Sequence, residues 1–220
     1  MKTLKKYLKL FLILILAYLG IGYFLHSVIF PEYKPDISNY FKPGDEFYSK
    51  EEGLRQTVIK QENGKVYCRV EIEPQAEGPP VHIHTKFDEI FVGGNHPLNI
   101  LVGKEELILN PGEKIVIPKG TPHKPYNKSD STVTLIMADN AAFPEDFAVY
   151  LSQVYGYMDE SEDNMKPPRI IFQMAMFNQY FDSYLGGGPP VFLQKSVYFL
   201  IVPLARSLGY KSYYKKYEEK

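Results

Sequence analysis

The chain has 220 residues, which is enough for one domain with a sizeable core and an additional segment. Its formal net charge of −1 is unevenly distributed, because residues 1–44 carry +4, residues 45–165 carry −10 and residues 166–220 carry +5. The acidic centre argues against nucleic acid as a partner, since nucleic acid binds to a basic face of a folded domain. Two basic ends instead suit an anionic membrane surface.

The N-terminus carries a lysine-rich segment, residues 1–9, followed by an apolar run over residues 10–30. A helix of this length rises about 30 Å, the thickness of the hydrocarbon core of a bilayer. A cleaved signal peptide is the alternative, but residues 23–30 contain no small-x-small cleavage site. We therefore predict a single-pass membrane anchor, with the N-terminus in the cytoplasm and everything after Pro31 outside it.

Residues 31–44 contain three prolines and a glycine, and they are predicted to form an extended linker. Over residues 45–140, short alternating runs of apolar and polar residues indicate strands and, together, an all-β sandwich or barrel. The predicted strands cover residues 57–60, 65–73, 89–92, 98–102, 106–109, 114–118 and 132–138. Asn63-Gly64 predicts a hairpin between the first two, and Cys68, the single cysteine, is expected to be a buried thiol.

Two histidines one residue apart, His82 and His84, stand before Glu89. Side chains two residues apart on a strand point to the same face, so the two imidazoles aim at one point. Glu89 follows after a short bend and can bring a carboxylate to meet them. This stretch predicts a metal site that needs one more ligand.

The fourth ligand is indicated by a second motif, and here the sequence resembles the cupin superfamily. The second cupin motif, Gly-x5-Pro-x-Gly-x2-His-x3-Asn, matches at Gly112, Pro118, Gly120, His123 and Asn127. The first, His-x-His with a following Glu, matches at the residues named above, although its glycines are displaced. The resemblance implies a mainly β fold, a jelly-roll β-barrel over residues 45–140, with the N-terminal transmembrane helix and a C-terminal helical segment attached.

The resemblance also implies one divalent transition metal ion, bound by His82, His84, Glu89 and His123. Three imidazoles and one carboxylate leave coordination positions open, but the ligand types alone do not choose among Mn, Fe, Ni, Co and Zn. Asn127 is expected to be a structural hydrogen-bonding residue and His96 a surface residue. The side chains expected to line a substrate pocket are Tyr67, Phe91 and Tyr126.

Residues 141–220 are predicted to form a helical segment. Helices are expected from Pro144 to about Met158, over residues 170–181 and over residues 191–208, and Gly209 is expected to end the last one. These helices are apolar around most of their circumference and need a surface to cover. Packing on the barrel or on a partner subunit, as in a homodimer, and burial in the membrane interface both remain open.

Two function classes fit these observations. In the first, the protein is a membrane-anchored metal-dependent enzyme, dioxygenase-like or isomerase-like, that acts on a small molecule. In the second, it is a non-catalytic module that binds or senses a small ligand outside the membrane. The complete set of four ligands favours the enzyme. A membrane scaffold with a relict barrel is a third interpretation, and the sequence favours it least.

Overall fold

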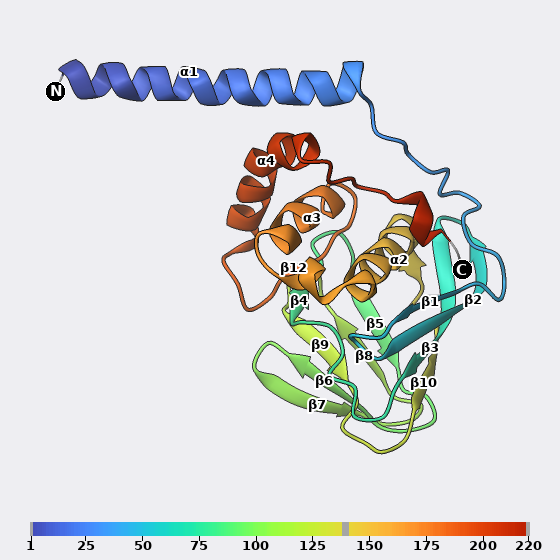
Figure 1. Cartoon of the computed structure of the whole chain (residues 1–220). Helices are drawn as coiled ribbons and strands as arrows, with labels where there is room; N and C mark the ends of the chain where they lie inside the picture. Colours follow the sequence, from blue (N-terminus) through green and yellow to red (C-terminus); the bar gives the residue numbers. More distant parts are fainter. Residues whose placement is uncertain (1, 138–140, 219–220) are drawn as a thin grey trace.

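The computed structural model describes residues 2–137 and 141–218. Figure 1 shows a long N-terminal helix lying beside a domain that has strands at one end and helices at the other. Some parts of the sequence-based prediction lie outside the described residues: Met1, the strand end at Ala138, the end of the predicted barrel at residues 139–140, and the last two residues of the C-terminal segment, 219–220.

The first sheet consists of antiparallel strands in the order β1 (Glu46–Ser49), β2 (Leu54–Glu62), β3 (Lys65–Ile72) and β10 (Val133–Ile136), and β11 (Phe143–Pro144) also pairs with β3. The predicted hairpin is confirmed. Asn63 and Gly64 join β2 and β3 with φ of 51° and 73°, the left-handed values that a two-residue hairpin loop of this kind requires. Cys68 lies on β3 and is fully buried, as predicted.

The second sheet has the order β12 (Tyr184–Leu185), β4 (His82–Ile83), β9 (His123–Tyr126), β6 (Leu98–Val102) and β7 (Glu105–Leu109). A separate pair is formed by β5 (Glu89–Val92) and β8 (Lys114–Ile117). The cupin-like β-sheet fold is therefore confirmed. The closed barrel is not, because no sheet closes on itself within residues 2–137 and 141–218. One reason is that the short strand β4 pairs on its second edge with β12, which comes from the C-terminal segment.

Three helices follow the strands: α2 (Glu145–Glu160), α3 (Arg169–Phe177) and α4 (Val191–Ser207), with single helical turns at Glu162–Met165 and Lys215–Tyr217. All three predicted helices are present, but α3 ends four residues early. The chain then turns so that Phe181 stacks on Phe147 of α2, with ring centroids 4.9 Å apart. Phe177 and Phe147 belong to the same buried cluster as strand residues such as Ile72, so the sheets and helices share one hydrophobic core.

The N-terminal helix α1 (Lys2–Phe24) continues through a wider helical turn at Leu25–Ile29. Residues Thr3–Ile29 are long and apolar enough to cross a membrane, and the most apolar window is 0% buried in the protein. A signal sequence would have the same length and composition. The N-terminal segment is thus an apolar helix that is exposed along its most apolar part.

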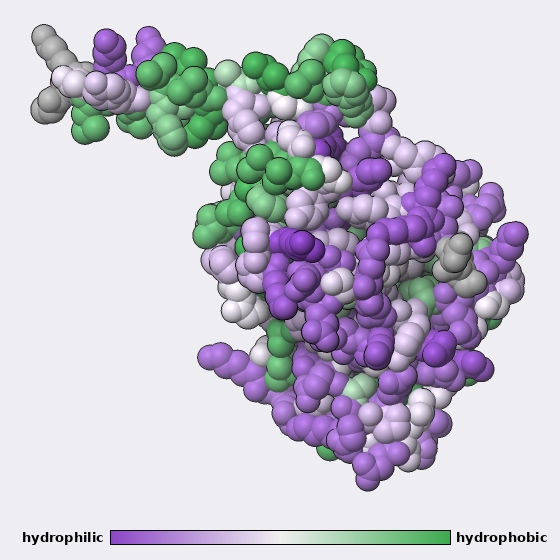
Figure 2. All heavy atoms as spheres, in the orientation of Figure 1, coloured by the Kyte–Doolittle hydropathy of each residue, from purple (hydrophilic) through white to green (hydrophobic). Residues whose placement is uncertain are grey.

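Helix α1 contacts α4 near the C-terminal end of α1. The Tyr18 hydroxyl donates to the Leu200 carbonyl at 3.0 Å, and the Tyr23 hydroxyl donates to the Phe199 carbonyl at 2.9 Å. Between them, Gly22 lies so close to Pro203 that an added Cβ would be 2.5 Å from the proline Cβ. Figure 2 shows hydrophobic side chains gathered along α1 and over the adjacent α4, whereas the strand end of the domain is mostly hydrophilic.

The predicted linker between α1 and the first strand is attached to the domain. The Glu32 carboxylate accepts hydrogen bonds from the Arg206 guanidinium at 3.2 Å and from the Ser212 hydroxyl at 2.7 Å. Farther along, the Tyr213 hydroxyl donates to the Tyr40 hydroxyl at 2.7 Å. The segment contains no helix or strand, and these long-range contacts hold it against the domain.

Candidate metal centre

Four side chains from three strands and a loop meet at one point. His82 lies on β4, His84 follows it, Glu89 begins β5 and His123 begins β9, and their ligand atoms all lie within 4.8 Å of one another. The register of β4 and β9 places His82 directly opposite His123. We call these four residues the metal cluster.

The Glu89 Oε2 atom is the centre of this cluster. The Nε2 atoms of His123, His84 and His82 lie 2.6, 3.2 and 3.9 Å from it. Two ligands that each sit about 2.1 Å from a metal ion are separated by about 3–4 Å. The 3.2 and 3.9 Å separations suit a single ion, whereas the 2.6 Å separation is that of a hydrogen bond between His123 and Glu89.

The other ring nitrogen of each histidine faces a backbone carbonyl. Nδ1 of His82 lies 3.0 Å from the Pro80 oxygen, Nδ1 of His84 lies 2.6 Å from the Asp182 oxygen, and Nδ1 of His123 lies 2.9 Å from the Thr121 oxygen. A carbonyl oxygen can only accept, so each Nδ1 is the protonated nitrogen. In the neutral form each Nε2 then has the lone pair that a ligating histidine requires, and the hydrogen bond from His123 Nε2 to Glu89 would give way to the metal ion.

Burial and mutual hydrogen bonds shift the pKa values of the cluster residues in different directions. Burial, with the neighbouring His84, lowers the pKa of His82 to about 3, so this imidazole is neutral at physiological pH. Burial opposes ionisation of Glu89, but hydrogen bonds from His123 and His84 outweigh it and hold the pKa of Glu89 well below its usual value. Burial also opposes protonation of His123, and the hydrogen bond to Glu89 reverses this and raises its pKa.

One atom of the cluster carries a further indication. His84 Nε2 is buried, and its one polar neighbour among the described residues is Glu89 Oε2 at 3.2 Å, outside good hydrogen-bond geometry, although a buried polar nitrogen normally has a well-placed partner. A donor set of imidazole and carboxylate suits Zn and the transition metals from Mn to Ni. The residues present therefore fit the metal ion that the sequence predicts.

Asp182, which the sequence analysis did not single out, holds the loop between His84 and Glu89. Its carboxylate accepts hydrogen bonds from the backbone N–H groups of Thr85 (2.7 Å) and Lys86 (2.6 Å) and from the Thr85 hydroxyl (2.7 Å). Its carbonyl orients His84, as described above. A sequence signal existed: Asp182 is one of only three acidic residues in the basic segment 166–220.

The remaining motif residues have structural positions. Gly112 and Gly120 have φ of 82° and 85°, where a side chain would be strained, and Pro118 directly follows β8. The buried Asn127 side chain donates to the carbonyls of Glu73 and Ser131, each at 2.8 Å. Asn127 thus joins two chain segments, in agreement with the structural role expected for it.

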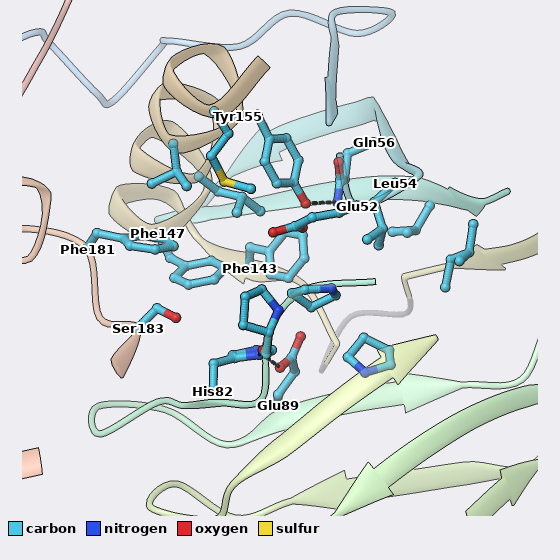
Figure 3. Close-up of a pocket in the computed structure, with 18 of the residues that line it drawn as sticks. Glu52, Leu54, Gln56, His82, Glu89, Phe143, Phe147, Tyr155, Phe181 and Ser183 are labelled. Carbon is cyan, nitrogen blue, oxygen red and sulfur yellow. Dashed lines mark hydrogen bonds and ion pairs between the residues drawn. The ribbon is translucent and has the colours of Figure 1, made fainter. Parts of the chain in front are cut away.

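A cavity of about 260 Å³ opens beside the cluster. His82 and Glu89 line one side of it, and aromatic rings of the C-terminal segment, including Phe143, Phe147 and Phe181, line another (Figure 3). Phe91, predicted to line a pocket, is part of this wall.

The other two predicted pocket residues lie outside the lining of this cavity. Tyr67 is covered by the Lys60 ammonium, 4.5 Å from its ring centroid, and Tyr126 by Lys128 at 5.2 Å. Lys60 is the cross-strand partner of Tyr67 and Lys128 follows Tyr126 by two residues, so both rings make cation–π contacts. His96 is exposed, as expected.

Comparison with known proteins agrees with these features. The family model described as "Cupin domain" matches residues 68–139. No curated protein matches the chain. Among solved structures, a cupin-2 domain containing protein from Shewanella frigidimarina is 30% identical, with 37% of this chain and 78% of that protein covered and a TM-score of 0.32.

Two further structures are similar over a comparable region. A sugar phosphate isomerase from a cupin superfamily, from Silicibacter pomeroyi, is 18% identical, with 48% of this chain and 64% of that protein covered and a TM-score of 0.36. A predicted oxalate decarboxylase from Thermotoga maritima is 14% identical, with 41% and 86% covered and a TM-score of 0.37. The activities in these names are those of the two proteins.

Proposed function

The chain belongs to the cupin superfamily, and from that premise we propose that it is a membrane-anchored enzyme that uses one divalent transition metal to act on a small apolar molecule. The observation that carries the proposal is the position of the metal cluster, since His82 and Glu89 face an apolar cavity rather than solvent or a packed core. A structural metal site would be closed on all sides.

The residues of the chain provide binding, orientation and exclusion of water. Backbone carbonyls fix the three imidazoles, Glu89 provides the negative charge, and the phenylalanine rings of the cavity hold an apolar substrate against the cluster. A bound divalent ion would supply a Lewis acid with positions open to substrate. Loading with Mn, Fe, Ni, Co and Zn in turn would identify the ion.

The membrane is the proposed partner of α1 and α4. The basic residues Lys5, Lys6 and Lys9 precede the apolar part of α1, so we place the N-terminus in the cytoplasm and the cupin domain outside it. The outer surface of α4 exposes large apolar side chains, including Phe192, which is 72% accessible, and Phe199, which is 53% accessible; exposed apolar patches are typical of membrane or protein contact sites. Because α4 lies against α1, both helices would meet the same bilayer.

The test is metal loading of the purified full chain with each of the five metals, followed by elemental analysis and turnover of small apolar substrates. We expect one ion per chain, lost in His84→Ala and retained in the matched control His96→Ala, whose histidine is exposed. A chain that takes up none of the five metals would contradict the metal site. A metal-loaded chain that binds small apolar molecules without turnover would support the non-catalytic binding or sensing module instead.

A further inference from the structure

The cavity opens to the surface through apolar side chains. Its most exposed large lining residues are Ile136 of β10, Ile171 of α3 and Leu185 of β12, which are 62%, 43% and 53% accessible. Within residues 2–137 and 141–218, no exposed charged side chain lines the cavity. Two of the three exposed residues come from the C-terminal region, and we call Ile171 and Leu185 the helix-side rim.

The helix-side rim lies beside α4. The Gln194 side chain of α4 bonds the backbone N–H and carbonyl of Leu185 at 3.1 and 2.9 Å. Tyr198 of the same helix lines the cavity, and its ring stacks on Tyr184 with centroids 6.5 Å apart. Helix α3, which carries Ile171, packs on α4 through a buried cluster of Ala175, Met176, Val202 and Ala205. Helix α4 therefore forms part of the cavity wall.

The opposite face of α4 is apolar and exposed. Leu193, Val197, Leu200 and Leu204 recur every three or four residues, so they share one side of the helix, and each is 40–44% accessible. Helix α1, which is long and apolar enough to cross a bilayer, contacts α4 through hydrogen bonds to the carbonyls of Phe199 and Leu200. With α1 in a bilayer, α4 would separate the cavity from the lipid, with Leu185 held beside this helix.

The size and lining of the cavity limit its occupant. A dry apolar cavity of about 150 Å³ holds one benzene molecule. The cavity of about 260 Å³ here has room for part of one hydrocarbon chain, and not for the two chains of a phospholipid. His82 and Glu89 offer a polar end, and Phe143, Phe147 and Phe181 line another side (Figure 3). The rest of a longer chain would have to leave through the mouth.

We propose that the cavity binds a single-chain lipid from the bilayer, with its polar end at the metal cluster and its hydrocarbon chain passing the helix-side rim. An apolar mouth beside a helix that faces lipid lets such a chain enter the protein without exposure to water, which apolar surface avoids. The assignment rests on the proposed function, because it names the substrate class of the same site.

The first experiment locates the helix-side rim relative to the bilayer. Cys68, the only cysteine, is buried, so an introduced surface cysteine can be labelled alone. Leu185→Cys and the control Ile108→Cys, at an exposed apolar residue of β7, are labelled with bimane in the full chain. Both are placed in phosphatidylcholine nanodiscs, with or without bromine on the acyl chains.

We expect brominated lipid to quench the label at Leu185 and to leave the label at Ile108 unchanged. Ile171→Cys gives the same comparison if Leu185→Cys does not fold. No quenching at the helix-side rim, or equal quenching at the rim and at Ile108, would overturn the assignment.

The second experiment identifies the occupant and its orientation. The full chain in ordinary phosphatidylcholine nanodiscs is irradiated with either of two hexadecanols, which carry a photoreactive diazirine near the hydroxyl group or near the far end of the chain. We expect the first probe to label the cavity wall around Phe147 and Phe181, and the second to label Ile171 and Leu185. Excess unmodified hexadecanol should abolish both reactions.

A charge on the helix-side rim should oppose passage of the hydrocarbon chain. Leu185→Arg should therefore reduce labelling inside the cavity, whereas the matched control Ile108→Arg should not. Absence of labelling, labelling that excess hexadecanol does not reduce, or the reverse pattern for the two probes would contradict the assignment. Equal labelling in both arginine variants would show that the chain does not pass Leu185, and the assignment would be wrong.

This assignment and the proposed function fail in different ways, because metal content is measured separately on the same preparations after loading. A chain that takes up one ion but is neither quenched nor labelled contradicts the lipid assignment alone. A chain that is quenched and labelled but takes up no metal supports the lipid assignment and contradicts the enzyme. If each nanodisc holds two chains and Leu185 is shielded from brominated lipid, a second copy covers the mouth, and the lipid assignment is wrong.

Discussion

The sheet region (residues 46–136) and the C-terminal region (residues 141–218) contribute to the site in different ways. The sheet region supplies every ligand of the metal cluster, within 42 residues of sequence. The C-terminal region supplies no ligand, but it provides Asp182, Tyr155 and the aromatic wall of the cavity. The metal cluster is thus local in sequence, whereas much of the cavity wall beside it comes from a distant segment.

The largest effect is expected from Phe177→Ala, which tests whether the two regions fold as one unit. Phe177 is fully buried in the core shared with the strands, and removing its ring costs about 3–5 kcal/mol. Unfolding of the full chain in detergent is followed by circular dichroism and by labelling of Cys68, the only cysteine, which is buried in β3. Both signals should shift together to lower urea concentration.

The control for this measurement is Leu208→Ala, since Leu208 is 58% exposed in the same region and its loss should change stability by less than about 0.5 kcal/mol. If Cys68 labelling stays unchanged in Phe177→Ala while the helical signal is lost, the regions unfold separately.

The next effect concerns Glu52, where the two regions meet. Its pKa is raised from 4.5 to about 7 in the folded protein, so the folded state holds the proton more tightly than the unfolded chain. This stabilisation is fully present below about pH 4.5 and is lost as the pH rises through about 7. The loss amounts to about 3 kcal/mol.

In Glu52→Gln no proton can be lost from this side chain, so the variant should keep its unfolding free energy between pH 5 and pH 8 where the wild type declines. Glu51→Gln, which changes an exposed neighbour, is the matched control and should decline like the wild type. Parallel pH profiles for wild type and Glu52→Gln would show that Glu52 titrates normally.

A smaller effect is expected for Asp182→Ala, which keeps all four ligands but frees the loop between His84 and Glu89. Residues that orient metal ligands typically contribute about 10–100-fold to metal affinity. We expect a loss in this range in a competition assay with a chromogenic chelator, and none in Asp163→Ala, whose carboxylate is exposed in the same region. Unchanged affinity in Asp182→Ala would confine the metal site to the sheet region.

The smallest effect is expected at the surface of α4. In a chain lacking residues 1–30, Phe192→Ser should weaken binding to anionic vesicles by about tenfold in a flotation assay, since burying a phenylalanine contributes about 1.5–3 kcal/mol. The basic part of this binding should weaken as salt is raised. Ile108→Ser, at an exposed apolar residue of β7 in the sheet region, is the control and should have no effect. If the chain without residues 1–30 does not bind vesicles of any composition, α4 packs within the domain and does not contact the membrane.

The features that could be predicted from the sequence are those that residues close together in the chain determine. The His-x-His spacing, Glu89 and His123 identified the metal cluster, and Asn63-Gly64 predicted its hairpin, because each is set within a few residues or by a motif. Asp182 and Glu52 were missed because their roles arise from contacts far apart in sequence, such as the bond between His84 and Asp182 across 98 positions. The closed barrel was wrong for the same reason, since β12 joins β4 from a segment with no strand pattern.

The docking of α1 on α4 has a mechanical consequence. A domain on a loose tether is free to rotate about it, but here Gly22 contacts Pro203 and Glu32 pairs with Arg206, so α1 is packed against the domain. From α4, the Gln194 side chain bonds both backbone groups of Leu185, at 3.1 and 2.9 Å, and Leu185 is the strand partner of His82. With α1 in a bilayer, a change in membrane thickness that tilts this helix would pull on the first histidine of the cluster through three consecutive contacts.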